Sequence, residues 1–147
     1  MTIRLPALQK ITDLKNRLTQ QANWQYAESQ RDLETEEHRL QDLEDSYQMG
    51  LDELHNLAGG SVSAQELHAW TEFLKLQRLQ IERQQQAVVK QQAVCQAKRT
   101  VLNEHYLDEQ KWVRLQERRK EEHARLLEKL SQEALDELAV TRHQGRR

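Results

Sequence analysis

The sequence has few of the residues that build turns. Its 147 residues include four glycines and one proline, although a compact domain of this size uses Gly or Pro in most of the turns between its packed elements. Only 5% of the residues are aromatic, so few large side chains are available to fill the core between packed layers. These scarcities exclude an all-β or α/β domain and favour a few long helices.

The residue patterns of most enzymes and metal sites are also missing. Cys95 is the only cysteine, so neither an intrachain disulfide nor a thiol-based zinc site is expected. No Gly-rich phosphate loop is present, because Gly59-Gly60 is not followed by Lys. The six histidines are scattered without metal-ligand spacing: His38, His55, His68, His105, His123 and His143. We therefore expect no enzyme, no catalytic residue, no cofactor and no bound metal.

The chain carries 22 Lys+Arg against 24 Asp+Glu, so its net charge offers no general attraction for nucleic acid. No apolar run approaches the ~20 residues that span a bilayer, and residues 1–15 lack the apolar core of a signal peptide. The sequence predicts a cytoplasmic chain with no nucleic-acid partner and no membrane insertion.

Apolar residues in the first third recur mostly at steps of three and four. Such a narrow stripe is typical of a coiled coil, and its regular leucines argue against disorder. The consecutive steps of four from Leu14 to Tyr26 predict a stutter. The predicted helix covers about residues 6–57, with Pro6 in its first turn. Its seam passes Ile11, Leu14, Leu18, Ala22, Tyr26, Leu33, Leu40, Leu43, Tyr47, Leu51 and Leu54, with Ser29 and Glu36 at seam positions.

The periodicity stops at residues 57–67, LAGGSVSAQEL. Gly59 is suited to the left-handed conformation that ends many helices. Ser63 and Glu66 have the spacing of a capping box that begins a new helix. The sequence therefore predicts a turn at residues 58–63.

A second helix is predicted over about residues 64–139, followed by a flexible tail at 140–147. Polar residues interrupt its seam at Gln77, Gln84, Gln91, Lys98, His105 and Glu109. The seam itself passes Leu67, Trp70, Leu74, Ile81, Val88, Cys95, Leu102, Trp112, Leu115, Leu126 and Leu130. Cys95 therefore reads as a buried small thiol rather than a reactive one. The predicted fold is one all-α domain over residues 1–147, an elongated antiparallel two-helix coiled coil with unequal arms.

A turn centred near residue 60 places position i opposite 121 minus i. Residues 22–48 carry eight acidic and two basic residues, and the facing residues 73–99 carry six basic and one acidic. Opposite blocks of charge support the intramolecular hairpin over parallel self-pairing.

The same register leaves residues beyond about 118 without a partner in the first helix. Their apolar residues form an amphipathic pattern: Leu126, Leu127, Leu130, Leu135 and Leu138. The segment is either a docking surface for another protein or a frayed helix end. The bases within residues 111–129 alternate with acids, as on a solvated face, or they contact an acidic protein rim or lipid head groups.

Two aromatic residues lie near the predicted turn. Phe73 is off the seam that contains Trp70. The pair either packs against Leu51 and Leu54 across the turn or forms an exposed patch with Leu76 and Leu79, the kind of anchor that interfaces use.

The chain resembles the flagellar FliJ family, small coiled-coil components of the bacterial flagellar type III export apparatus, over nearly its full length. The resemblance is carried by LPALQKITDLKNRLTQQA, by VSAQELHAWTEFLKLQRLQIERQQ after the loop, and by EEHARLLEKLSQEALDELAVTR. It implies a hairpin similar to the rotor stalk of rotary ATP synthases. It also implies a role in exporting flagellar subunits and assembling the flagellum, at the cytoplasmic face of the inner membrane at the flagellar base.

The resemblance implies two main partners, with export chaperones as further candidates. Paired terminal segments would enter the ring of the hexameric export ATPase, through Leu8, Ile11, Arg118, Arg119, Leu126, Leu127 and Leu130. A patch after the loop would bind the large cytoplasmic domain of the export gate, through Phe73, Leu76, Gln77, Gln80 and Ile81. Gln77 and Gln80 depart from the apolar and small residues of the family pattern. The alternatives are the stalk of a related injectisome secretion system and a structural coiled-coil adaptor with no ATPase partner.

Overall fold

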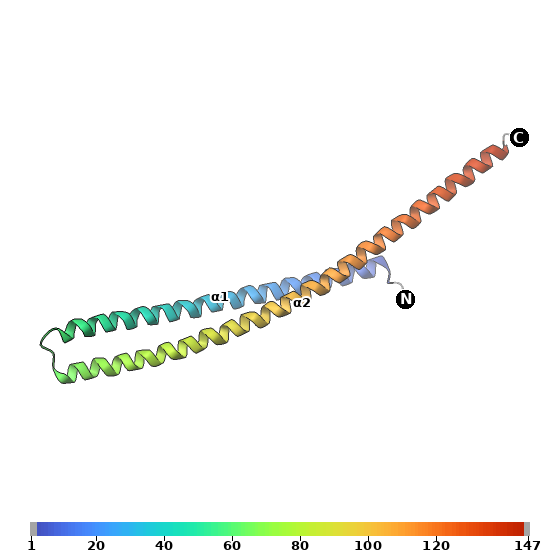
Figure 1. The fold of residues 1–147 in the computed structure, drawn as a ribbon. Coiled ribbons are helices and arrows are strands. Elements are labelled where there is room, and N and C mark those ends of the chain that lie inside the picture. Colours follow the sequence, from blue (N-terminus) through green and yellow to red (C-terminus); the bar gives the residue numbers. More distant parts are fainter. Residues whose placement is uncertain (1–2, 146–147) are drawn as a thin grey trace. The chain divides into compact units, whose positions relative to one another are not determined.

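The computed structural model describes residues 3–145 and contains two helices. Helix α1 spans Leu5–Ala58 and helix α2 spans Ala64–Gly145, and residues 3–145 contain no strand (Figure 1). The two helices pack against each other antiparallel, since position 29 of α1 contacts positions 91 and 95 of α2. The predicted all-α helical hairpin with arms of unequal length is confirmed.

The helix ends follow from local chemistry. Pro6 lies in the first turn of α1, where a missing N–H costs little. The Ser63 hydroxyl accepts a hydrogen bond from the Glu66 backbone N–H at 3.2 Å, which caps α2 as the spacing predicts. Helix α1 does not end through a left-handed Gly59, because no glycine within residues 3–145 has a positive φ. Instead, the Gly60 N–H donates to the Leu57 carbonyl at 3.1 Å, a tighter closure that satisfies one free carbonyl.

The C-terminal boundary of α2 differs from the prediction. The helix continues to Gly145 rather than ending near 139, because no proline or glycine interrupts residues 140–144 and the Thr141 hydroxyl bonds the Glu137 carbonyl at 2.9 Å. Most of the expected flexible tail is therefore helical, and its last two positions lie outside the described residues.

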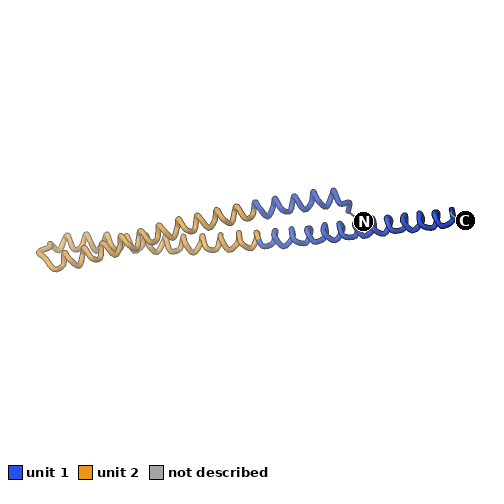
Figure 2. The backbone as a smooth tube through the Cα atoms, turned by 90° about the horizontal axis from the view of Figure 1, so that it is seen from above, with its two compact units in different colours: residues 1–21, 103–147 blue, residues 22–102 orange. Residues whose placement is uncertain are grey.

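The chain divides into two compact units, where the sequence predicted one domain (Figure 2). We call residues 22–102, which include the turn, the loop unit. The described part of the other unit, residues 3–21 and 103–145, is called the terminal unit.

In the loop unit, the seam repeats every seven residues on both helices. Helix α2 contributes an apolar column and a polar column, and the polar column donates hydrogen bonds to α1 backbone carbonyls: Gln84 Nε2 to Glu36 at 2.9 Å and Gln91 Nε2 to Ser29 at 3.2 Å. The Cys95 thiol is buried and donates to the same Ser29 carbonyl at 3.0 Å. The apolar column comprises Leu74, Ile81, Val88, Cys95 and Leu102.

Gly50 is a buried seam residue of the loop unit. A Cβ at this position would lie 2.9 Å from Leu74 Cδ2 and 3.4 Å from Gln77 Oε1. The absence of a side chain thus lets α1 approach α2 closely next to Trp70. The sequence pattern placed Leu51 on this part of the seam, and Leu51 is half-buried beside Gly50.

In the terminal unit, the seam follows seven-residue spacing rather than apolar residues. Leu8 and Thr12 are buried and Lys15 is half-buried, whereas Leu14 is 53% exposed. The predicted stutter through Leu14 is therefore wrong. The side chains at positions 8, 12 and 15 keep the three-and-four alternation of the loop unit, so the heptad continues with polar residues in it.

The predicted register is correct to within one helical turn, since it placed residues 92 and 85 opposite Ser29 and Glu36. The expected charge pairing is not formed as ion pairs. Within residues 22–102, the ion pairs are between neighbours on one helix, such as Arg39–Glu36 at 3.1 Å and Lys75–Glu72 at 3.2 Å. Glutamine amides and the Cys95 thiol make the hydrogen bonds between the helices of this unit, and one of the amides, Gln84, also donates to the Glu36 carboxylate.

Candidate partner-binding surfaces

Polar contacts join the two helices of the terminal unit. Lys15 Nζ lies 2.7 Å from Asp108 Oδ2, and Asn16 Nδ2 donates to Glu109 Oε1 at 2.8 Å. Gln116 Nε2 donates to Gln9 Oε1 about two turns further along. Glu109 and Gln116 are buried, so these bonds satisfy groups that would otherwise be costly to desolvate. They fix where α1 begins relative to α2.

The hydrogen bond from Lys15 lowers the pKa of the Asp108 carboxyl below its ordinary value of 3.8. The positive charges of Lys15, Lys111 and His105 act in the same direction, and desolvation acts against them. Because the folded chain holds the ionised carboxylate more tightly than the unfolded chain does, this stabilisation is present above pH 3.8. It is lost as the pH falls through the lowered pKa.

An Asp108→Asn variant is therefore expected to be less stable than the wild type at pH 7, and the difference should shrink as the pH falls from 7 to 2. Thermal unfolding followed by circular dichroism at the two pH values checks this. Asp32→Asn, at an exposed position with no contact to α2, is the matched control. A difference between wild type and Asp108→Asn that is as large at pH 2 as at pH 7 would show that the asparagine disturbs packing instead.

The C-terminal part of α2 has no cover within the terminal unit. Residues 120–145, which we call the C-terminal extension, are all exposed. Its leucines and Val140 are between 53% and 58% exposed, and the segment is helical throughout. The alternative of a frayed end therefore does not describe this segment, which presents an ordered, unpartnered amphipathic face.

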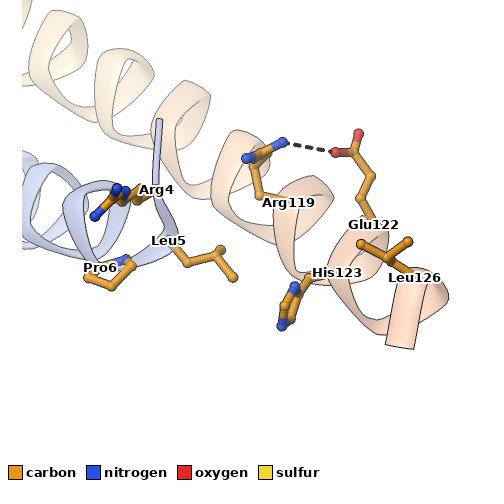
Figure 3. Close-up of a pocket in the computed structure, with 7 residues that line it drawn as sticks. All are labelled: Arg4, Leu5, Pro6, Arg119, Glu122, His123 and Leu126. Carbon is orange, nitrogen blue, oxygen red and sulfur yellow. Dashed lines mark hydrogen bonds and ion pairs between the residues drawn. The ribbon is translucent and has the colours of Figure 1, made fainter. Parts of the chain in front are cut away.

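A hollow of about 670 Å³ lies where α1 begins against α2 (Figure 3). Arg119 spans its edge, donating to the Ile3 carbonyl at 3.3 Å and pairing with Glu122 at 3.4 Å. Leu126 belongs both to the hollow and to the extension. The lining residues are Arg4, Leu5, Pro6, Arg119, Glu122, His123 and Leu126. The hollow thus joins the apolar first turn of α1 to the exposed face of α2.

The residues expected to bind the ATPase ring fall into two groups. Arg118, Leu126, Leu127 and Leu130 are exposed on α2, and Arg119 is half-buried next to Ile3. On α1, Ile11 is half-buried and Leu8 is 1% exposed. A side chain buried between the helices offers no surface to a partner, so in this conformation the extension, and not Leu8, is available.

Near the turn, Trp70 and Phe73 make an edge-to-face contact with ring centroids 5.8 Å apart and an interplanar angle of 84°. Trp70 is half-buried against the seam, whereas Phe73 is 49% exposed. Both interpretations thus hold in part: Trp70 packs within the hairpin and supports an exposed Phe73. Leu76 and Leu79 are 60% and 48% exposed on the same helix.

The five residues expected to bind the gate do not share one exposed face. Phe73, Leu76 and Gln80 are exposed, whereas Gln77 and Ile81 lie on the seam and are half-buried. The buried Gln77 Oε1 has no hydrogen-bond partner within residues 3–145. The accessible part of this patch is therefore Phe73, Leu76 and Gln80, with Leu79 nearby.

Sequence reasoning missed the α1 side of the hollow. Arg4, Leu5 and Pro6 were not among the predicted binding residues, because their role depends on which part of α2 they face. The predicted register placed them opposite residues 115–117, which is short of the observed lining residues at 119–126. A register corrected by the Gln9–Gln116 contact would have come closer.

The described residues contain neither a metal-binding cluster nor a membrane-spanning helix. Across residues 3–145, no group of three or more His, Cys, Asp or Glu side chains is arranged to hold a metal ion. Neither helix, over its described length, contains an apolar stretch long enough to cross a membrane.

Comparison with known proteins gives one match. A protein-family model described as flagellar FliJ protein matches residues 4–147. No curated protein and no solved structure matches the chain significantly.

Proposed function

Because the chain belongs to the FliJ family of flagellar proteins, and so to components connected with flagellar protein export, we propose that it is a non-enzymatic stalk. In this role it binds the ring of the export ATPase and links it to the cytoplasmic domain of the export gate. It works at the cytoplasmic face of the inner membrane at the flagellar base, and export chaperones are further partners.

The observation that carries the proposal is the exposed C-terminal extension. Helices in proteins gain most of their stability by packing an apolar face, yet Leu127 and Leu130 are more than half exposed. A partner that surrounds this helix would cover these leucines. The interior of an ATPase ring provides such a surface.

The charges of the extension suit a contact that changes during a cycle. Bases and acids alternate along residues 117–129, so no single strong patch of one sign is available to a partner. Exposed ion pairs of this kind contribute only about 0–1 kcal/mol each. A stalk that must not lock onto one subunit of a ring needs many weak contacts of this type.

The proposal is tested by measuring ATP hydrolysis and hexamer formation by the cognate export ATPase with and without the chain. We expect direct binding and a higher rate of hydrolysis. An absence of both binding and stimulation would favour the structural adaptor with no ATPase partner.

The second proposed contact, with the export gate, centres on Phe73. A Phe73→Ala variant is expected to bind the gate's cytoplasmic domain at least tenfold more weakly, because a half-exposed aromatic ring supported by Trp70 has the properties of an interface anchor. Calorimetry measures the affinity, and circular dichroism checks that helicity is kept.

Trp24→Ala is the matched control for Phe73→Ala. Trp24 is a 60% exposed aromatic residue on α1 of the same unit. Equal affinities of wild type and Phe73→Ala would mean that Phe73 serves only to pack against Trp70.

A further inference from the structure

We propose that residues 3–21, which we call the N-terminal strap, detach from α2 as one segment while the loop unit stays paired. Detachment exposes Leu8 and uncovers the α2 residues that the closed strap contacts, from Asp108 to Arg119. It is a property of the free chain and does not depend on the stalk role. Three features favour it: the polar seam of the terminal unit, the weak hold of its polar contacts and the uncapped start of α1.

The seam of the terminal unit buries little apolar surface. The apolar column of α2 ends at Leu102, since the next two positions at seven-residue spacing are Glu109 and Gln116, both buried polar residues. On the strap, Leu8 is buried, but the seam positions that follow it are polar: Thr12, Lys15 and Thr19. The other apolar side chains at this seam are only half-buried: Ile11, Leu18 and Trp112. Because apolar burial is the main force that pairs two helices, the strap is held less firmly than the loop unit.

The polar contacts hold the closed strap weakly. When the strap detaches, water replaces the partner of each hydrogen-bonded side chain, so a hydrogen bond opposes detachment by much less than its strength in an apolar medium. The Lys15–Asp108 pair, whose side chains are 26% and 40% exposed, is also screened by solvent. The buried Thr12 hydroxyl donates to the Leu8 carbonyl of its own helix at 2.8 Å, and that bond is kept when the strap detaches. These contacts set the register of the closed strap but oppose its opening only weakly.

The start of α1 lacks the groups that stabilise a helix N-terminus. Arg4 precedes the helix, and a guanidinium cannot accept a hydrogen bond from a free backbone N–H. The first turn contains no acidic residue that would interact favourably with the helix dipole. Helix α2, by contrast, begins with the Ser63 cap and has Glu66 in its first turn. Separation can therefore start at the first turn of α1 and proceed toward residue 21.

Detachment changes the surface that α2 presents. Trp112 and Leu130 are 18 residues apart, which is about five helical turns, so the face covered by the strap continues into the apolar face of the extension. With the strap closed, this face is uncovered only from residue 120 onward. With the strap open, it extends back to about residue 108, and Leu8 is exposed as well. The strap thus acts as an autoinhibitory contact that limits the length of α2 available to a partner.

Thiol labelling tests the proposal, because a buried thiol can be followed in each unit. Cys95 is the native thiol of the loop unit and is buried. Thr12→Cys adds a thiol of similar size at a buried seam position of the strap. The purified full-length variant is treated with excess N-ethylmaleimide, and peptide mass spectrometry gives the labelling rate at each position. Each rate is divided by its value in the urea-unfolded chain, which removes differences in intrinsic reactivity.

We expect position 12 to be labelled at least tenfold faster than Cys95. Adding Leu8→Ala is expected to speed labelling at position 12 at least tenfold, whereas Leu14→Ala, at an exposed position of the strap, should leave it unchanged. Adding Val88→Ala, at a buried position of the loop unit, is expected to speed labelling of Cys95 at least fivefold and to leave position 12 unchanged. Circular dichroism confirms that each variant is helical.

Two results would overturn the proposal. The first is labelling at position 12 that is no faster than labelling of Cys95. The second is a Val88→Ala effect of the same size at both positions, since opening of the strap would then require the whole hairpin to unfold. Neither result bears on ATPase binding, because only the chain and the reagent are present.

Discussion

Replacing Leu8 by alanine is expected to lower the free energy of unfolding by about 3 kcal/mol, in the range measured for buried Leu→Ala changes. Leu8 is 1% exposed and is the one large side chain within residues 3–145 that is fully buried. The seam around it includes the buried polar side chains Thr12 and Gln116, which cannot fill an apolar cavity without leaving polar groups poorly satisfied. Urea unfolding followed by circular dichroism measures the loss.

Leu14→Ala is the matched control for Leu8→Ala. The two leucines lie six residues apart on α1, yet Leu14 is 53% exposed. Its replacement is expected to change stability by less than about 0.5 kcal/mol, as for ordinary surface positions. Equal losses for the two variants would mean that the seam runs through Leu14 after all and that the observed heptad is wrong.

Replacing Leu127, Leu130 and Leu138 together by serine is expected to reduce stimulation of the export ATPase at least tenfold while leaving the unfolding midpoint of the hairpin nearly unchanged. The three side chains are 53–57% exposed, so their loss is expected to remove partner contacts and little internal packing. ATP hydrolysis and thermal unfolding, measured on the same preparation, separate the two effects.

A triple variant with the same chemistry, Leu76→Ser, Leu79→Ser and Val89→Ser, controls for the general loss of exposed apolar surface. These side chains are 48–63% exposed on α2 of the loop unit. If this variant lost stimulation as completely as the extension variant, the extension would have no special role in binding the ATPase.

The hairpin could be predicted from the sequence because the features that determine it are local. The break at Gly59-Gly60, the Ser63 cap and the regular leucines each act within a few residues. The uncovered end of α2 followed from the same information, since the distance from the turn to each terminus fixes which arm is longer. Such features need no knowledge of side-chain contacts.

The seam of the terminal unit could not be predicted from hydrophobic spacing. Thr12, Lys15, Glu109 and Gln116 hold positions that a coiled coil normally gives to apolar residues. Their hydrogen bonds and ion pair to the facing helix replace the missing apolar contacts. A seam predicted from the spacing of leucines therefore includes Leu14, although Leu14 is exposed.

The same dependence on pairing explains the errors in the predicted partner residues. Leu8 and Leu126 are both leucines of the terminal unit, and only the register of α1 against α2 makes one buried and the other exposed. Likewise, Phe73 and Gln77 are one turn apart, yet Gln77 faces the seam beside Gly50. Which face of a helix is free is a property of the packed hairpin.

Hydrogen exchange of the chain, alone and bound to the cognate export ATPase hexamer, tests the central claim most directly. We expect binding to slow exchange in residues 120–145 and in the first turn of α1, and to leave exchange near Phe73 unchanged. Unchanged exchange in residues 120–145 together with protection near Phe73 would contradict it, because the ATPase would then bind the surface assigned to the gate.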